Sequence, residues 1–131
     1  MKTRWRVVLV IAVGGAAAIA VNFARDSYSQ AKREAAYQSI LLSYSVALKP
    51  GTTRTAVESY LHQRGATFER VCCANGSAFQ ERSLIGKEDS PWYCSRNDVY
   101  LSFQFEGPER TVSDADTLRS IEVRHELGAC L

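Results

Sequence analysis

The feature that most constrains this chain is an uncharged apolar run close to its N-terminus. A basic flank containing Lys2, Arg4 and Arg6 is followed by the run Val7–Val21. This order of basic flank and apolar run is typical of segments that direct a chain into or across a membrane. The run has no polar face, which disfavours a helix of a soluble domain. We therefore treat these residues separately from the folding domain.

Two interpretations of this segment stay open. With residues 22–24 the run reaches eighteen residues, and a helix of that length spans about 27 Å, close to the thickness of a bilayer core. In the first interpretation, residues 1–24 are an uncleaved signal anchor that continues without a turn residue into Arg25–Leu48. In the second, they are a signal peptide cleaved after Ala20, at the small-x-small site Ala18–Ala20. The basic flank keeps the N-terminus cytoplasmic, so we expect a single-pass inner-membrane protein with its domain outside, or alternatively a secreted or periplasmic domain.

The rest of the chain, about 107 of the 131 residues, is enough for one small domain. All fourteen acidic residues and thirteen of the sixteen basic ones lie beyond position 24, so this part is nearly neutral. A nucleic-acid-binding domain would need a basic patch, and the sequence contains none. The expected partners are therefore the membrane, through residues 7–24, and another envelope protein, with no nucleic acid.

Four cysteines indicate an exported, disulfide-bonded domain. They are Cys72, Cys73, Cys94 and Cys130. An even number in an exported chain usually means disulfides, with free buried thiols or a metal site as the alternatives. The spacing has no C-x-x-C pair, and neither His62 nor His125 completes a zinc-ligand pattern. We expect no metal site, a solvent-facing His62 and a partly buried His125.

Two helices are expected at the start of the domain. From Asp26 to Leu48 large apolar residues recur with the i, i+3, i+4 spacing of an amphipathic helix. Lys49–Gly51 ends this helix, because proline cannot continue it and glycine suits the turn. Thr52 or Thr53 offers an N-cap hydroxyl for a second helix ending at Gly65. Its apolar face carries Val57, Tyr60 and Leu61.

Beyond Gly65 the apolar period changes to two, which predicts strands. We expect four, over Thr67–Ala74, Ala78–Ile85, Val99–Phe105 and Leu118–Leu127. Asn75–Gly76 predicts a type I′ turn between the first two, and Gly86–Asn97 is expected to be a polar connection. The expected fold class is α+β: an N-terminal membrane helix, then a helix hairpin packed on a four-stranded antiparallel sheet. The organisation is an anchor over 1–24, a helical extension with the first helix over 25–48, and the remaining extracytoplasmic domain over 49–131.

The register of the last two strands gives a sharper expectation. If they form an antiparallel pair turning near Val112, alternate residues of each strand face the core together. The matched pairs are Phe103 with Ile121, Leu101 with Val123, and Cys94 with Cys130. Leu127 is placed on the core side as well. The register makes Cys94–Cys130 the first choice for a disulfide. For Cys72 and Cys73, adjacent and on opposite faces, a strained vicinal bridge and one thiol pairing elsewhere stay open.

The stretch LKPGTTRTAVESYL, Leu48–Leu61, resembles the signature of the SmpA/OmlA-type small bacterial envelope proteins. In that family a hydrophobic residue, a glycine, a threonine N-cap and then Val and Leu four apart mark the helix–turn–helix before an antiparallel sheet. The resemblance is strongest over Ser45–Gly65. It implies the β-lactamase-inhibitor-protein-like fold, in which two helices pack on such a sheet, and it carries over no binding residue.

No catalytic or cofactor motif is present, so we expect no enzyme and no cofactor. There is no Gly-x-Ser-x-Gly turn. Asp114 and Asp116 lack the rest of a calcium loop and are expected in a solvated loop. Trp92 and Tyr93, in the polar connection, are the candidates for binding a partner, with packing over the neighbouring disulfide as the alternative. The expected function is a non-enzymatic interaction or structural domain of a membrane-anchored envelope protein; a secreted inhibitor-like binding module is the alternative.

Overall fold

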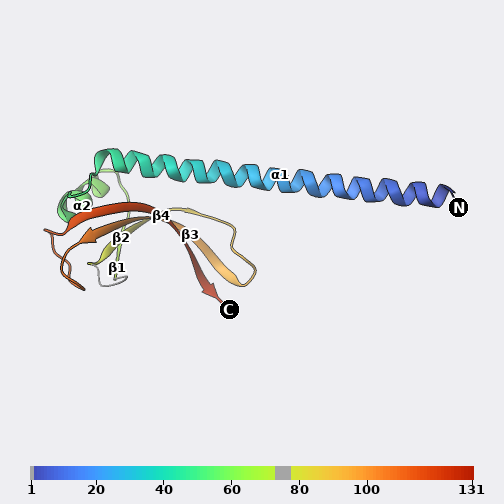
Figure 1. Ribbon diagram of the computed structural model, residues 1–131. Coiled ribbons are helices and arrows are strands. Elements are labelled where there is room, and N and C mark those ends of the chain that lie inside the picture. Colours follow the sequence, from blue (N-terminus) through green and yellow to red (C-terminus); the bar gives the residue numbers. More distant parts are fainter. Residues whose placement is uncertain (1, 73–77) are drawn as a thin grey trace. The chain divides into compact units, whose positions relative to one another are not determined.

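The computed structural model describes the backbone of residues 2–72 and 78–131, and the side chains of residues 17–72 and 78–131. The elements are α1 (Lys2–Ala47), α2 (Arg54–Gln63), β1 (Glu69–Val71), β2 (Gln80–Lys87), β3 (Cys94–Glu106) and β4 (Thr117–Cys130). Figure 1 shows them in chain order. The chain divides into two compact units, residues 1–36 and 37–131, so the boundary falls inside α1.

The first unit is the N-terminal part of α1. This helix runs without interruption from Lys2 to Ala47, so the helix expected from Asp26 continues back through the apolar run. Its described apolar side chains, such as Ile19 and Phe23, are exposed. Within the described residues, no helix is long and apolar enough to cross a membrane. The side chains of residues 1–16, which supply the first part of the apolar run, lie outside the described part.

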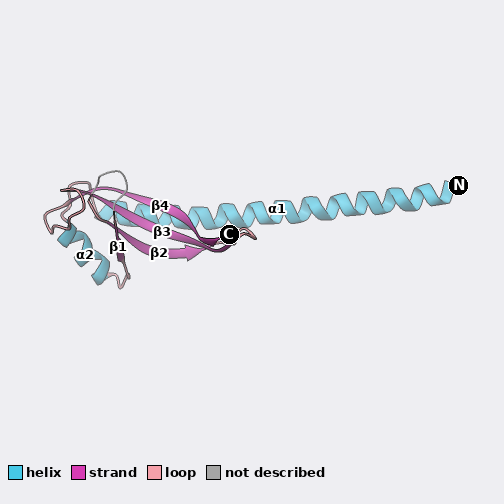
Figure 2. Ribbon diagram, turned by 90° about the horizontal axis from the view of Figure 1, so that it is seen from below, coloured by secondary structure: helices cyan, strands magenta, loops and turns pink. Residues whose placement is uncertain are grey.

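The second unit is an α+β domain, in which two helices pack on a four-stranded antiparallel sheet, as the sequence predicts. The strand order is β1-β2-β3-β4, and every neighbouring pair is antiparallel. Figure 2 shows the four strands side by side. The final turns of α1 and the whole of α2 supply the helical side of the core.

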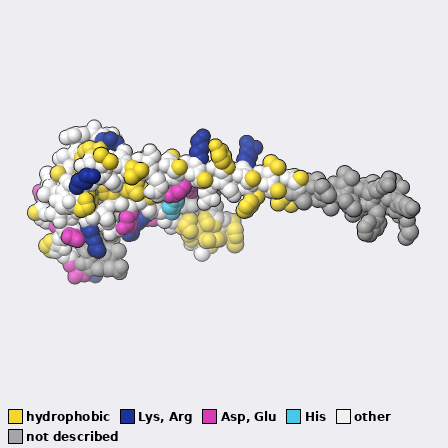
Figure 3. Space-filling model, turned by 45° about the horizontal axis from the view of Figure 1, so that its top comes forward, with side chains coloured by type: hydrophobic (Ala, Val, Ile, Leu, Met, Phe, Trp, Pro, Cys, Tyr) yellow, Lys and Arg dark blue, Asp and Glu magenta, His cyan; other side chains and the backbone are white. Residues whose placement is uncertain are grey.

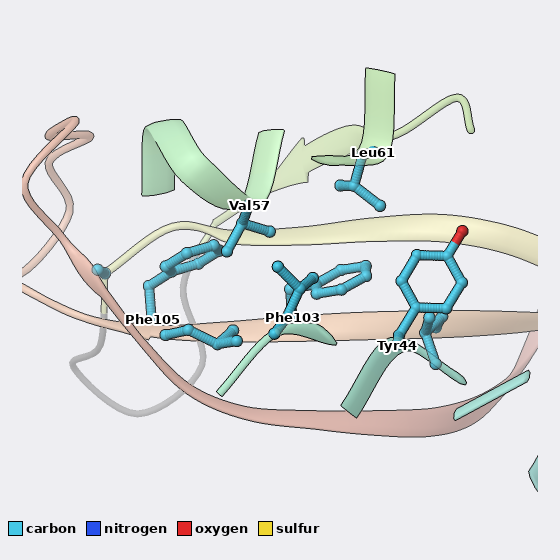
Figure 4. Close-up of a cluster of buried hydrophobic side chains, with 9 residues drawn as sticks. Tyr44, Val57, Leu61, Phe103 and Phe105 are labelled. Atoms are coloured by element: carbon cyan, nitrogen blue, oxygen red, sulfur yellow. The ribbon is translucent and has the colours of Figure 1, made fainter. Parts of the chain in front are cut away.

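The core forms on the face of β3 that the alternating pattern predicts. The four alternating residues are at most 2% exposed: Val99, Leu101, Phe103 and Phe105. Val57 and Leu61 of α2 lie against this face, and the ring of Tyr44 in α1 meets that of Phe103 edge-on with centroids 6.0 Å apart (Figure 4). Ile121 and Val123 complete the core as partly buried neighbours.

The predicted register between β3 and β4 is confirmed. Phe103 pairs with Ile121, Leu101 with Val123, and Cys94 with Cys130. Leu127 was predicted on the core side, but it is 49% exposed. Within this unit, the helix that covers the sheet reaches β4 only as far as His125, whose ring contacts Tyr37, the first residue of the unit. Leu127 lies beyond that point and is left uncovered.

Some strand boundaries differ from the prediction. β1 covers only Glu69–Val71, and the predicted Asn75–Gly76 turn lies outside the described residues. β3 begins at Cys94 and not at Val99, so the last four residues of the expected polar connection, 94–97, are strand. These residues are mostly polar, so no apolar pattern in the sequence marks them as strand. They are held in the sheet by pairing with β4, which extends as far as Cys130.

The turn between the helices fixes α2 against the sheet. Gly51 has a φ of 90°, a conformation that glycine adopts without a steric penalty. Its N–H donates to the carbonyl oxygen of Leu118 at 2.7 Å, and the N–H of Leu118 donates to Thr52. The hydroxyl of Thr53 accepts from the N–H of Ala56, which confirms the predicted N-cap. The α2 helix therefore starts at a fixed point beside the beginning of β4.

Candidate interaction site and buried charge cluster

At the end of the sheet where α2 begins, the structure encloses a group of charged side chains. Arg54, the first residue of α2, is 0% exposed. Its Nη1 donates to Oε1 of Glu81 at 2.7 Å, and its Nε and Nη2 donate to Oδ2 of Asp116 at 3.2 and 3.0 Å. Nη2 also donates to the carbonyl oxygen of Phe79, and the guanidinium carbon lies 4.0 Å from the centroid of the Phe105 ring. The buried charge is thus paired and hydrogen-bonded, the condition under which such a group is tolerated.

Asp116 is built into this cluster from the loop between β3 and β4. Its side chain accepts a further hydrogen bond from the N–H of Ser113, and its carbonyl oxygen accepts one from the N–H of Arg54. A Cβ at Gly107 would lie 2.0 Å from Oδ1 of Asp116, so only glycine leaves room there. The prediction of a solvated loop was wrong for Asp116, which is 3% exposed, and holds for Asp114.

The third member of the cluster is Glu81 of β2, whose carboxyl lies next to that of Glu58. Burial, together with the adjacent carboxyl of Glu58, raises the pKa of Glu81 to about 7, although Arg54 opposes the shift. Its Oε2 receives no hydrogen bond from a described donor, which fits a protonated carboxyl that donates to Glu58. Burial is the largest single influence on Glu58 and acts to raise its pKa, but the hydrogen bond from Arg70 at 2.6 Å, the hydrogen bond with Glu81 and the charges of Arg70 and Arg54 together lower it.

These buried charges tie three segments together and meet no solvent. Arg54, Glu81 and Asp116 come from α2, β2 and the loop before β4, and their side chains are at most 1% exposed. A substrate has no access to them, so we interpret the cluster as structural. Neither the charge pattern nor the spacing of these residues pointed to it in the sequence.

The opposite end of the sheet carries exposed aromatic side chains. Trp92 is 90% exposed and Tyr93 is 43% exposed, and their rings stand nearly perpendicular with centroids 5.7 Å apart. We call these two residues the aromatic tip. Figure 3 shows hydrophobic side chains gathered in a projecting group on the surface. The alternative expectation, in which the pair packs over the disulfide, does not fit the exposure of Trp92.

The aromatic tip is held on a closed base. The disulfide between Cys94 and Cys130, the pairing that the register predicted, joins the ends of β3 and β4. The N–H of Cys94 donates to the carbonyl oxygen of Pro91 at 2.9 Å, and the N–H of Leu131 donates to that of Tyr93 at 2.8 Å. The two aromatic residues therefore belong to a constrained turn, which limits the entropy lost when they bind.

The other residues singled out in the sequence form no site in the described structure. His62 is exposed as expected, with its ring 5.3 Å from that of Phe68. His125 was expected to be partly buried and is exposed; it lies beyond the aliphatic core, and the ring of Tyr37 meets it edge-on at 6.1 Å. Cys72 is disulfide-bonded, and Cys73 lies outside the described residues. Among the residues described, no group of three His, Cys, Asp or Glu side chains is placed to hold a metal ion.

Comparison of the chain with protein-family models, with curated proteins and with solved structures finds no match in any of the three. What the domain does has to be inferred from its own residues. They provide an enclosed charge cluster at one end and an exposed aromatic pair at the other. Of the two, only the aromatic pair is accessible to another molecule.

Proposed function

We propose that this chain is a single-pass, membrane-anchored envelope protein whose α+β domain lies outside the cytoplasmic membrane and acts by binding, not by catalysis. The observation that carries the proposal is the exposed aromatic tip, Trp92 and Tyr93, on a disulfide-closed base. The anchor is proposed from the sequence of residues 7–24 and the basic flank before it. The disulfide supports an oxidising location, because such bonds are rare in the cytosol.

Binding is favoured over catalysis by where the polar and apolar groups lie. Three of the four described groups with shifted pKa values, Glu58, Arg70 and Glu81, lie together around the fully buried Glu81, and the fourth, Arg82, is held in salt bridges with Glu69 and Glu126. The accessible feature is a pair of large rings, and Trp and Tyr are the side chains most often found at the centre of binding surfaces. We therefore propose that the aromatic tip holds the domain to a component of the envelope.

The alternative remains a secreted inhibitor-like binding module released by cleavage after Ala20. Anchor and cleavage differ in whether residues 1–20 are retained. We also propose a fold-level relationship to the SmpA/OmlA-type proteins. It is supported by the Thr53 N-cap, the turn at Gly51 and the packing of two helices on an antiparallel sheet.

The test is fractionation of cells expressing the full chain, followed by intact mass measurement. We expect full-length protein in the membrane fraction, resistant to carbonate extraction, with the domain accessible to protease from the extracytoplasmic side. A variant with Ile11 and Val13 replaced by Arg interrupts the apolar run and should leave the membrane fraction. Recovery of soluble protein lacking residues 1–20 would establish the secreted alternative and overturn the anchor.

A further inference from the structure

We propose that the partner of the aromatic tip is the lipid bilayer itself, and that Trp92 and Tyr93 lie in the interfacial layer of the membrane that holds the anchor. This inference rests on the proposed anchor in residues 7–24 and names what the tip binds. Four properties carry it: the end of the domain at which the chain enters, the length of the tether, the size of the tip and the charges around it.

The chain enters the domain at the end of the sheet that carries the aromatic tip. Tyr37, the first residue of the domain unit, donates its hydroxyl hydrogen to Oε1 of Glu88 at 2.9 Å, and its ring lies against His125. Glu88 follows the last residue of β2, and His125 lies in the half of β4 that ends at the disulfide. After α1 has ended, Gly51 is bonded to Leu118, at the other end of β4. Within this unit, α1 therefore starts on the same side as the tip.

The tether between the apolar run and the domain is short. Residues 25–36 are twelve in number, and as a helix they span about 18 Å. The distance from the start of the domain to the tip can be estimated along the end of the chain. His125 lies against Tyr37, and Leu131, six residues later, is hydrogen-bonded to Tyr93; six residues of strand cover about 20 Å. The two lengths are similar, so the length of the tether does not prevent the tip from reaching the bilayer surface.

The size of the tip fits a lipid surface better than a protein. A stable protein interface buries about 800 Å² on each partner, whereas a Trp or Tyr side chain buries about 150 to 250 Å². A tip of two such rings falls short of the first value. Trp and Tyr are, however, the residues enriched at the membrane–water interface, where an apolar ring and a polar group are both accommodated.

The charges at the tip's end of the sheet include no excess of basic residues. Lys87 and Arg96 are basic, Glu88 and Asp89 are acidic, and the neighbouring strand positions carry Asp98 and Glu126, so this end of the domain has no net positive charge to attract anionic headgroups. Leu131, which is fully exposed and bonded to Tyr93 through its N–H, adds apolar surface. We therefore expect binding that depends on insertion of the rings and is insensitive to salt and to the fraction of anionic lipid.

The experiment uses the full chain reconstituted in phosphatidylcholine vesicles. The chain has two tryptophans, Trp5 and Trp92, so Trp5→Phe leaves Trp92 as the only tryptophan, which can be excited at wavelengths that tyrosine does not absorb. We expect its emission to be shifted to shorter wavelength and to be quenched by lipids brominated high on the acyl chain, equally at low and high salt. The matched control adds Trp92→Phe and Val112→Trp. It places the fluorophore in the exposed loop at the far end of β3, where we expect emission typical of water and no quenching by lipid.

The outcomes separate this inference from the proposed anchor. Vesicle flotation is measured first, and protein that does not float with the vesicles would contradict the anchor and the inference together. Protein that floats while Trp92 stays unquenched would overturn the bilayer contact and leave the anchor standing. Equal quenching at positions 92 and 112 would also overturn it, because the contact would then not be specific to the tip. Quenching at position 92 alone supports it, since these vesicles contain no protein partner.

Discussion

The two ends of the sheet place opposite kinds of side chain in opposite environments. At the end where α2 begins, Arg54 and Glu81 are fully buried, whereas at the other end Trp92 is 90% exposed. The buried charges have partners for nearly all their polar atoms, whereas the exposed Trp92 ring meets the ring of Tyr93 edge-on. Folding alone explains the first end, because a paired charge cluster joins α2, β2 and the loop before β4. It gives no reason for the second, which is why we assign binding there.

This difference predicts how the protein responds to mutation. Removing one partner from a buried charge pair leaves the other charge uncompensated and is strongly destabilising. Removing an exposed side chain usually changes the free energy of unfolding by less than about 0.5 kcal/mol. Substitutions at the two ends should therefore separate stability from binding.

The largest effect is expected for Arg54→Met. The variant keeps most of the side-chain volume but leaves Glu81 and Asp116 without their common cation, so we expect the free energy of unfolding to fall by about 3 to 5 kcal/mol. The measurement is denaturant unfolding of the full chain in detergent. Arg119→Met is the matched control, since the Arg119 side chain is 66% exposed and its loss should change little. A fall below 1 kcal/mol for Arg54→Met would contradict the structural role of the cluster.

The second largest loss of stability is expected when the disulfide at the base of the tip is removed. Replacing Cys94 and Cys130 together by serine removes a link between residues 36 positions apart, for which the chain-entropy model gives about 3 to 4 kcal/mol. The same unfolding measurement applies, with the wild type under reducing conditions as a second comparison. If the double variant and the wild type unfold at the same denaturant concentration, the bond does not stabilise the domain.

A smaller effect with a defined pH window is expected for Glu81→Gln. The pKa of Glu81 is about 7 in the folded protein against 4.5 as its ordinary value, so the folded state binds more protons in this range and wild-type stability should fall as the pH rises from about 4.5 to 7. The lowered pKa of Glu58 acts in the opposite sense, with stability lost as the pH falls below 4.5. Glutamine does not titrate and can still donate to Glu58, so the decline between 4.5 and 7 should flatten.

Unfolding curves measured at several pH values test this, with Glu106→Gln as the control, since that side chain is 67% exposed. An unchanged slope in Glu81→Gln would show that Glu81 is ionised in the folded protein.

The smallest effect on stability is expected at the aromatic tip. Replacing Trp92 and Tyr93 together by serine should change the free energy of unfolding by less than about 1 kcal/mol, because Trp92 is 90% exposed and Tyr93 keeps 43% of its surface exposed. The melting temperature of the full chain is the measurement. A loss of stability as large as that of Arg54→Met would show that both residues are part of the folded core, and it would contradict their assignment to binding.

The comparison also separates what the sequence predicted from what it could not. The face of β3, the register with β4 and the Thr53 N-cap follow from local signals, namely a period of two, a strand pairing across one loop and a hydroxyl before a helix. The Arg54 cluster depends on partners 27 and 62 residues away, and no short-range pattern marks such contacts. The first residues of β3 were missed for a similar reason, because their strand conformation depends on pairing with β4.

The most direct test of the account is photo-crosslinking from position 92 in native membranes. A photoreactive phenylalanine derivative replaces Trp92 in the full chain, and the same residue at position 112, in the exposed loop at the far end of the sheet, is the control. We predict adducts to lipid from position 92 and none from position 112. A discrete protein adduct from position 92 in place of lipid would contradict the assignment of the bilayer as the partner of the aromatic tip.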